Sequence, residues 1–228
     1  MPNILSNKLL EIACFNIESC LLAQEAGADR IEFCTDYSLG GITPQHHDIL
    51  KVKQLLHIPL HIIIRPRGGD FYYSKQEIET IKKDIEFCKA NNINGVVFGA
   101  LSEAKKINKA VNKELVELAG DMSTTFHRAM DECNNIQEAM NDIVSLGFNR
   151  VLTSGGKQNA IEGIKVLKSL QEEYHKNIII IPGGGIRSSN VKEVIQQTNC
   201  TEYHSAAITT KTDTVNSEEV KQLKTMLS

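Results

Sequence analysis

The chain has 228 residues, of which 41% are hydrophobic and 23% are charged, a composition typical of a globular protein with a sizeable core. A formal net charge of −3 and a pI near 6.2 give no general attraction to polyanions, and no dense basic stripe marks a nucleic-acid-binding face. The first residues lack the pattern of a signal peptide, and no apolar run approaches membrane-spanning length. We expect a cytoplasmic protein without nucleic-acid or membrane partners.

Short apolar runs alternate with amphipathic stretches along the whole chain. The expected strands are Leu9–Cys14, Arg30–Cys34, Leu60–Ile64, Gly95–Phe98, Ser123–His127, Arg150–Thr153, Ile178–Ile181 and Glu202–Ser205. The expected helices are Ile17–Ala26, Pro44–Leu56, Ser74–Ala90, Lys113–Ala119, Asn135–Leu146, Asn159–Tyr174, Ser188–Gln197 and Ser217–Leu227. One helix follows each strand.

Capping residues support these helices. Asn16 precedes the first helix, Ser74 and Glu77 form a capping-box pattern, and Gly27 and Gly147 stand where helices end. Alternating strands and helices require a parallel sheet, and eight such units without a linker indicate an α/β protein with a (β/α)8 TIM-barrel fold in a single domain. A doubly wound open sheet is the alternative architecture.

The third expected strand ends abruptly in arginines and glycines, in the run from His61 to Asp70. In parallel α/β folds the carboxyl ends of the strands carry the functional residues. Arg65 and Arg67, with the open backbone of Gly68 and Gly69, suit an oxyanion such as phosphate or carboxylate. The alternative is that these arginines pair with carboxylates and only stabilise the barrel.

Alternation along the first strands places carboxylates inside the barrel. If Leu10 and Ile12 face the helices, Glu11 faces the interior, and the same reasoning places Glu32 inside. Two carboxylates near His61 provide the elements of acid–base catalysis or of a metal site. The alternative is that these glutamates pair with arginine and fill a layer of the barrel.

The fifth expected strand leads into His127, Arg128 and Asp131. An imidazole, a guanidinium and a carboxylate thus fall within a few residues of each other at the expected functional rim. We expect His127 and Asp131 to act in proton transfer and Arg128 to bind an anion.

The glycine run Gly183, Gly184 and Gly185 follows the seventh strand and leads toward a helix expected to begin near Ser188. Free N–H groups in such a loop bind anions, and the loops after strands seven and eight of TIM barrels often form a phosphate site. Ser205 after the eighth strand and Ser154 after the sixth are the expected additional donors.

Six cysteines are scattered without a CxxC pair, which indicates thiols in a reducing compartment and excludes a zinc ribbon. Cys14 and Cys34 end the first two strands, which are neighbours in a barrel, so two thiols could hold a soft ion such as Cu(I). Cys14 is out of phase with Glu11 unless the strand bends. The alternative is two small buried apolar side chains.

Seven motifs carry a family resemblance that runs from about Leu10 to Ala207 and so covers most of the chain. They are Leu10-Glu11-Ile12-Ala13-Cys14, Gly27-Ala28-Asp29-Arg30-Ile31-Glu32-Phe33-Cys34, Gly40-Gly41-Ile42-Thr43-Pro44, Ile64-Arg65-Pro66-Arg67-Gly68-Gly69-Asp70-Phe71, Thr125-Phe126-His127-Arg128-Ala129, Arg150-Val151-Leu152-Thr153-Ser154-Gly155 and Pro182-Gly183-Gly184-Gly185-Ile186. Through these motifs the chain resembles the CutC family of copper homeostasis proteins.

The resemblance implies a TIM barrel, a cytoplasmic location, a homo-oligomer and a role in copper homeostasis with copper binding. Cys14 and Cys34 match the family's cysteines at the ends of the first two strands. Leu39 departs from the family pattern, where an acidic residue is expected, as do Met130 and the turn at Lys105-Lys106-Ile107-Asn108.

Two functions follow from these patterns. The first is a copper-handling protein that binds Cu(I) through Cys14 and Cys34. The second is an enzyme of the isomerase, epimerase or lyase type that acts on a small anionic or phosphorylated metabolite at the C-terminal face of the barrel.

Overall fold

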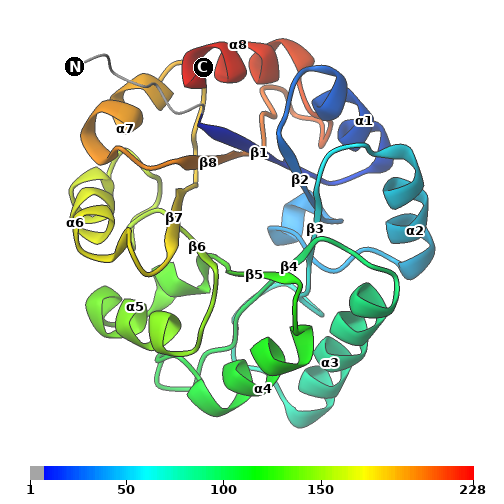
Figure 1. Ribbon diagram of the computed structural model, residues 1–228, viewed down its shortest axis with the longest axis vertical. Coiled ribbons are helices and arrows are strands. Elements are labelled where there is room, and N and C mark those ends of the chain that lie inside the picture. Colours follow the sequence, from blue (N-terminus) through cyan, green and yellow to red (C-terminus); the bar gives the residue numbers. More distant parts are fainter. Residues whose placement is uncertain (1–7) are drawn as a thin grey trace.

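A computed structural model describes residues 8–228, in which eight parallel strands form a barrel surrounded by eight helices (Figure 1). The strand order is β7-β6-β5-β4-β3-β2-β1-β8, so consecutive strands pair from β1 to β7, and β8 pairs with β1. β7 and β8 lie side by side and nearly close the ring. The TIM-barrel prediction is confirmed, and the open doubly wound sheet is not the architecture.

The elements agree with the apolar periodicity of the sequence. The strands are β1 Leu9–Cys14, β2 Arg30–Phe33, β3 Leu60–Ile63, β4 Gly95–Phe98, β5 Ser123–Phe126, β6 Arg150–Thr153, β7 Ile179–Pro182 and β8 Glu202–Ser205. The α-helices are α1 Ile17–Glu25, α2 His46–Leu55, α3 Lys75–Ala90, α4 Lys109–Ala119, α5 Ile136–Ser145, α6 Ile164–Tyr174, α7 Val191–Thr198 and α8 Ser217–Leu227. Short 3₁₀ helices span Tyr37–Leu39 and Arg128–Glu132.

The expected caps are present. The Asn16 side chain accepts the N–H of Ser19 at 2.8 Å, and Ser74 and Glu77 form a reciprocal capping box. Gly27 and Gly147 adopt φ values of +98° and +82° just after their helices, a backbone conformation that glycine allows at little cost.

Three helices begin three or more residues away from the expected position. α4 starts four residues earlier than expected, because Asn108 caps it by accepting the N–H of Val111. α6 starts five residues later, after a turn in which Asn159 accepts the N–H of Glu162. α7 starts three residues later, at Val191. None of the helices within residues 8–228 is long and apolar enough to cross a lipid bilayer.

The two faces of the sheet differ in chemistry. Leu10, Ile12, Ile31 and Phe33 are buried in the layer between the strands and the helices, as the alternation predicts. The barrel interior instead holds a chain of buried charges. At its centre, Arg30 donates to Glu11 on β1 and to Glu202 on β8, both at 2.5 Å.

The charge chain continues to the amino-terminal end of the barrel, where Arg150 donates to Glu202 at 3.0 Å and to the hydroxyl of Ser123. All of these groups except Arg150 and Ser123 are at least nine-tenths buried. Charges in such a place are tolerated only when they are paired, because each loses its hydration on folding.

Removal of Arg30 is expected to destabilise the fold strongly. In Arg30→Met the carboxylates of Glu11 and Glu202 lose their shared partner, and we expect the free energy of unfolding to fall by about 3–5 kcal/mol. Urea denaturation followed by circular dichroism measures this change. Lys168→Met, which removes a solvent-exposed i,i+4 pair with Glu172, is the control and should change the stability little. Equal effects of the two substitutions would contradict the role given to Arg30.

Candidate functional site

A cavity of about 260 Å³ opens at the carboxyl ends of the strands, where TIM barrels carry their active sites. Ligand pockets usually occupy roughly 300–1,000 Å³, so this cavity suits a small molecule. Its wall includes residues from the end of nearly every strand, among them Ala13, Glu32, Cys34, Arg65, Phe71, His127, Arg128, Gly184, Gly185, Arg187, His204 and Ser205.

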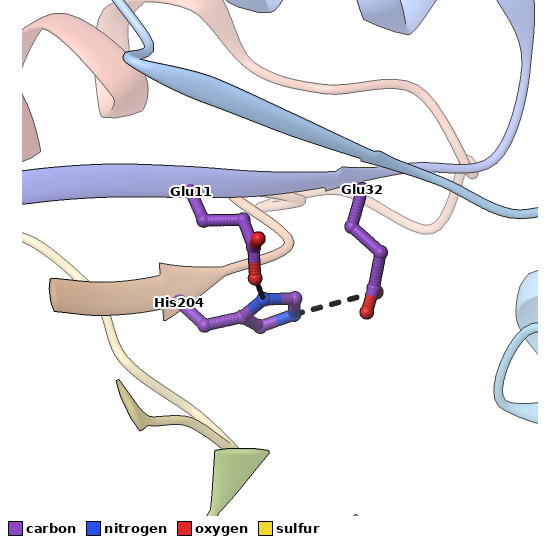
Figure 2. A group of neighbouring side chains, drawn as sticks. All are labelled: Glu11, Glu32 and His204. Atoms are coloured by element: carbon purple, nitrogen blue, oxygen red, sulfur yellow. Dashed lines mark hydrogen bonds and ion pairs between the residues drawn. The ribbon is translucent and has the colours of Figure 1, made fainter. Parts of the chain in front are cut away.

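Two carboxylates and an imidazole lie close together at this end of the barrel (Figure 2). Glu32 and His204 line the cavity, whereas Glu11 does not. His204 on β8 lies between Glu11 on β1 and Glu32 on β2, because β1 pairs with both of the other strands and Glu11 is in register with His204. The Nδ1 atom of His204 is 2.7 Å from Oε1 of Glu11, and its Nε2 atom is 3.8 Å from Oε2 of Glu32. All three residues are buried.

The charges in this cluster are set by burial and by mutual contacts. Burial alone would raise the pKa of Glu11, but Arg30 and His204 outweigh it and hold that pKa well below its usual range. Burial opposes the charged form of His204, yet Glu32 and Glu11 raise its pKa. Burial, together with the nearby charge of Glu11, raises the pKa of Glu32. In this cluster an ionised Glu11 orients His204, and the two carboxyl groups favour the protonated form of its imidazole.

The two histidines predicted from sequence lie in different places. His61 sits in the barrel interior, with Nδ1 3.8 Å from Oε2 of Glu11, and it does not line the cavity. His127 does line the cavity. Burial lowers the pKa of both histidines to about 3, helped at His127 by the positive charge of Arg65. Both rings are therefore neutral near pH 7.

The His127 ring presents a hydrogen-bond donor. Its Nδ1 atom accepts the backbone N–H of Ala129, which places the ring proton on Nε2. The Nε2 atom is buried and has no hydrogen-bond partner among residues 8–228. A neutral imidazole with a free Nε2–H can polarise a carbonyl or hydroxyl group of a ligand.

The two arginines of the β3 loop have different environments. Arg65 lines the cavity with 6% of its surface exposed, and its guanidinium donates only to the carbonyl oxygens of Leu39, Gly41 and Gly69. Arg67 lies outside the cavity, in ion pairs with Glu77 at 2.5 Å and Asp70 at 3.0 Å. The alternative interpretation, structural pairing with carboxylates, therefore describes Arg67 and not Arg65.

The carboxylate of Asp131 is bonded to other groups of the protein. It accepts the N–H groups of Ser154 and Gly156 at 3.0 Å and the hydroxyl of Thr153 at 2.5 Å. It also pairs with Arg128 at 2.8 Å, and Arg128 in turn donates to the Ser154 hydroxyl. The structure therefore places Asp131 as an internal anion that orders the loop after β6, and the Ser154 donors expected to face a ligand serve this carboxylate instead.

The glycine loop after β7 is partly open. The N–H of Gly183 donates to the carbonyl of Thr153, whereas those of Gly184 and Gly185 have no acceptor within the described residues. The helix expected to begin near Ser188 begins at Val191 instead. The N–H and the hydroxyl of Ser188 donate to the buried carboxylate of Glu219. A side chain of the protein thus occupies the anion position of that turn.

Ser205, the last residue of β8, also has internal partners, although it lines the cavity. Its hydroxyl donates to the carbonyl of Ile186 at 2.7 Å and accepts from Arg187 at 3.2 Å. Ser205 therefore positions the Arg187 guanidinium at the cavity wall.

Cys14 and Cys34 lie on opposite faces of the sheet. Cys14 packs with the apolar layer under the helices, beside Cys20, whereas Cys34 lines the cavity with its sulfur 3.4 Å from Oε2 of Glu32. Burial raises the pKa of both thiols well above the usual value, so both are protonated near pH 7. The out-of-phase position of Cys14 in the sequence already indicated this separation.

Two residues of the site escaped the sequence reasoning. His204 lies two residues after Glu202 on β8, so both side chains point to the same face of the sheet. The alternation used for the first two strands, applied to β8, would have placed His204 in the interior beside Glu11. Arg187 follows the glycine run and lines the cavity, but only the folded loop shows that its guanidinium turns inward toward Ser205.

The depressed pKa of His127 has a measurable consequence. A histidine with a pKa of about 3 when folded and about 6.5 when unfolded binds its proton mainly in the unfolded state, so stability is lost as the pH falls through this interval. Between pH 7 and pH 5 this loss is about 2 kcal/mol for one residue. Between pH 7 and pH 5 we expect the free energy of unfolding to fall by about 2 kcal/mol less in His127→Gln than in wild type, because the variant lacks this titrating group. Urea denaturation at both pH values measures the difference. The exposed His175→Gln is the control, and identical pH dependence of wild type and His127→Gln would show this prediction to be wrong.

Comparison with known proteins agrees with the motifs. Residues 8–209 match the model of the CutC family. The human copper homeostasis protein cutC homolog is 41% identical over 203 residues, which are 89% of this chain and 74% of the human protein. A CutC family protein of Bacteroides fragilis is 41% identical over 204 residues, covering 89% and 81% of the two chains.

Solved structures show the same relationship. The structure of CutC from Streptococcus agalactiae superimposes with a TM-score of 0.82 and 29% identity, covering 87% of this chain and 98% of that one. Phosphoribosyl anthranilate isomerase from Thermotoga maritima, with a TM-score of 0.64, 13% identity and coverage of 96% and 98%, shares the barrel fold alone. The family match, the human and bacterial relatives and the fold lead to one conclusion: this chain belongs to the CutC family.

Proposed function

We propose that this protein takes part in copper homeostasis by binding a copper ion at the mouth of the barrel. The human and mouse relatives carry the name copper homeostasis protein, and they share about two-fifths of their aligned residues with this chain. The cytoplasmic location and the homo-oligomer that the family resemblance implies form part of this proposal.

The observation that carries the copper proposal is the set of donors around Glu32. The thiol of Cys34 is 3.4 Å from its carboxylate, and the Nε2 atom of His204 is 3.8 Å from the same oxygen. Sulfur and imidazole nitrogen are the ligands that copper prefers in its reduced state. Glu11 holds the Nδ1 side of His204, as carboxylates behind metal-binding histidines commonly do. Cys34 and His204 would hold the ion, with Glu32 as a weaker oxygen donor.

Copper binding at these donors must displace the proton of the Cys34 thiol, because burial raises the pKa of this thiol well above its usual value. The raised pKa of His204 means that protons also compete with copper for this imidazole. Cys14 faces away from this point, toward the helices. The proposal therefore assigns the metal to Cys34 and His204 and gives Cys14 no direct contact with it.

Copper binding can be tested by titration of Cu(I) under reducing conditions against a competing chromophoric chelator. We expect one ion per chain, loss of binding in Cys34→Ser, and affinity lower by about tenfold or more in His204→Gln. Cys14→Ser and Cys88→Ser are matched controls, because both thiols are buried in the outer apolar layer, and both variants should bind like wild type. Binding that survives Cys34→Ser, or that is lost only in Cys14→Ser, would contradict this assignment.

A second function is favoured by a separate observation, which is the excess of cationic groups in the cavity wall. Arg65 and Arg187 both line the cavity, and neither forms an ion pair with a carboxylate among residues 8–228. Such cations repel a metal ion and attract an anion. This pattern favours an enzyme that acts on a small anionic metabolite.

In this second function the cations hold the anion, and the floor of the cavity supplies the chemistry. Glu32, whose pKa is raised by burial, can exchange a proton with a ligand, and the neutral His127 can donate a hydrogen bond from Nε2. Isomerases, epimerases and lyases commonly combine a carboxyl group that transfers a proton with a neutral hydrogen-bond donor that stabilises the developing charge.

The enzymatic function is tested by incubating the protein with small phosphorylated and carboxylated metabolites in D₂O and following deuterium incorporation by NMR. We expect exchange into at least one of them, slowed by about 100-fold or more in Glu32→Gln with ligand binding retained. Glu162→Gln, a change on the exposed turn before α6, serves as the control. Exchange that is unaffected by Glu32→Gln, or absent with every metabolite, would count against an enzyme of this type.

A further inference from the structure

We propose that the ligand of this cavity carries an anionic group at each of its two ends. This inference rests on the second of the two functions above, the binding of a small anionic metabolite, and it names the class of that metabolite. It is carried by the placement of two free cations on opposite walls of one small cavity.

The first anion position is at Arg65, at the end of β3. A guanidinium has five N–H groups, and backbone carbonyls use three of those of Arg65, which leaves the Nε–H and one N–H of Nη2. Because the buried hydroxyl of Tyr73 also lies beside Arg65, we assign the ligand to the free N–H of Nη2. The Nε atom of Arg65 is buried without a partner, and the flat face of the guanidinium lies 4.7 Å over the ring of Phe71. Among residues 8–228 this buried cation contacts carbonyl dipoles, an aromatic ring and the Tyr73 hydroxyl but no carboxylate, so it lacks the counter-charge that such a position requires.

The second anion position is at Arg187, which follows the glycine loop after β7. Its guanidinium donates to the carbonyls of Ile186 and Ile208 and to the hydroxyl of Ser205, so two of its five N–H groups also stay free. The N–H groups of Gly184 and Gly185 lie in the same wall and have no acceptor in residues 8–228. Free backbone N–H groups in a glycine turn beside an arginine suit a phosphate or a carboxylate.

These two positions face each other across the barrel. β3 and β7 are four strands apart in either direction around the eight-stranded ring, so they stand on opposite sides of the mouth (Figure 1). Both arginines nevertheless line one cavity of about 260 Å³. A compact ligand of a few carbon atoms can therefore place one anionic group at each wall.

Besides the two arginines, the cavity wall carries further polar groups among apolar side chains such as Phe15 and Leu152. Glu32 and His204 form the cavity floor, and the Nε2–H of His127 is free to donate. The middle of the ligand is therefore expected to carry a hydroxyl or carbonyl oxygen. Together these features describe a small hydroxy or oxo acid with a second carboxylate or a phosphate at the other end.

Three matched probes test this inference by isothermal titration calorimetry. 3-Phosphoglycerate has a carboxylate and a phosphate at its two ends, glycerate has only the carboxylate, and glycerol 3-phosphate has only the phosphate. We expect 3-phosphoglycerate to bind at least about tenfold more tightly than either single-ended probe, because it alone engages both arginines. Arg187→Gln should remove most of that advantage.

Arg67→Gln is the matched control, because Arg67 lies in the same loop as Arg65 but outside the cavity, and it should bind all three probes like wild type. A variant of Arg65 is not required, since that residue also holds three loop carbonyls in place. Equal affinity for the double-ended probe and the tighter single-ended one would overturn the two-ended ligand while leaving an anion-binding cavity. Failure of all three probes to bind would overturn the anion-binding function as well.

Discussion

The buried ion pair between Arg30 and Glu11 is the interaction on which the candidate site depends. Because Arg30 holds Glu11 ionised, Glu11 can orient His204, and His204 in turn faces Glu32 at the cavity floor. Without a cation below it, burial would favour the neutral form of Glu11. The chemistry at the carboxyl end of the barrel is therefore set by a residue one layer deeper.

This arrangement links the stability of the fold to the charge states of the candidate site. In most TIM barrels the lower layers stabilise the fold and the upper loops carry the chemistry. Here the charges run without interruption from Arg150 through Glu202 and Arg30 to the cavity floor. Apolar replacements that strengthen other cores would remove the field that sets the charge states of the site.

The sequence allowed the fold and part of the site to be predicted, because both depend on local periodicity. Alternation along single strands placed Glu11 and Glu32 in the interior, and capping patterns placed most helix ends within one or two residues. The later start of α7 could not be foreseen, since Ser188 bonds to Glu219, 31 residues further along the chain. Long-range partners of this kind have no local signature.

The same limit explains why some of the candidate site residues lie outside the cavity or bond within the protein. Arg65 and Arg67 are two residues apart in one loop and cannot be distinguished by sequence. In the structure Arg67 forms an ion pair with Glu77 and lies outside the cavity. Asp131 resembled a catalytic acid because nothing in the sequence shows that the loop after β6 folds around its carboxylate. The residue type predicts which groups a side chain can bind, but whether it can bind a ligand depends on which groups of the folded protein already bind it.

The carboxylate of Asp131 also determines how much ordering a ligand would have to bring about. Because this internal anion already organises the amides after β6 and anchors Arg128, that side of the cavity keeps its shape without a ligand. Binding there incurs little loss of loop entropy, so the interaction energy of the ligand is available for affinity and selectivity. The protein is preorganised on this wall, and the approach of a ligand resembles the docking of rigid bodies.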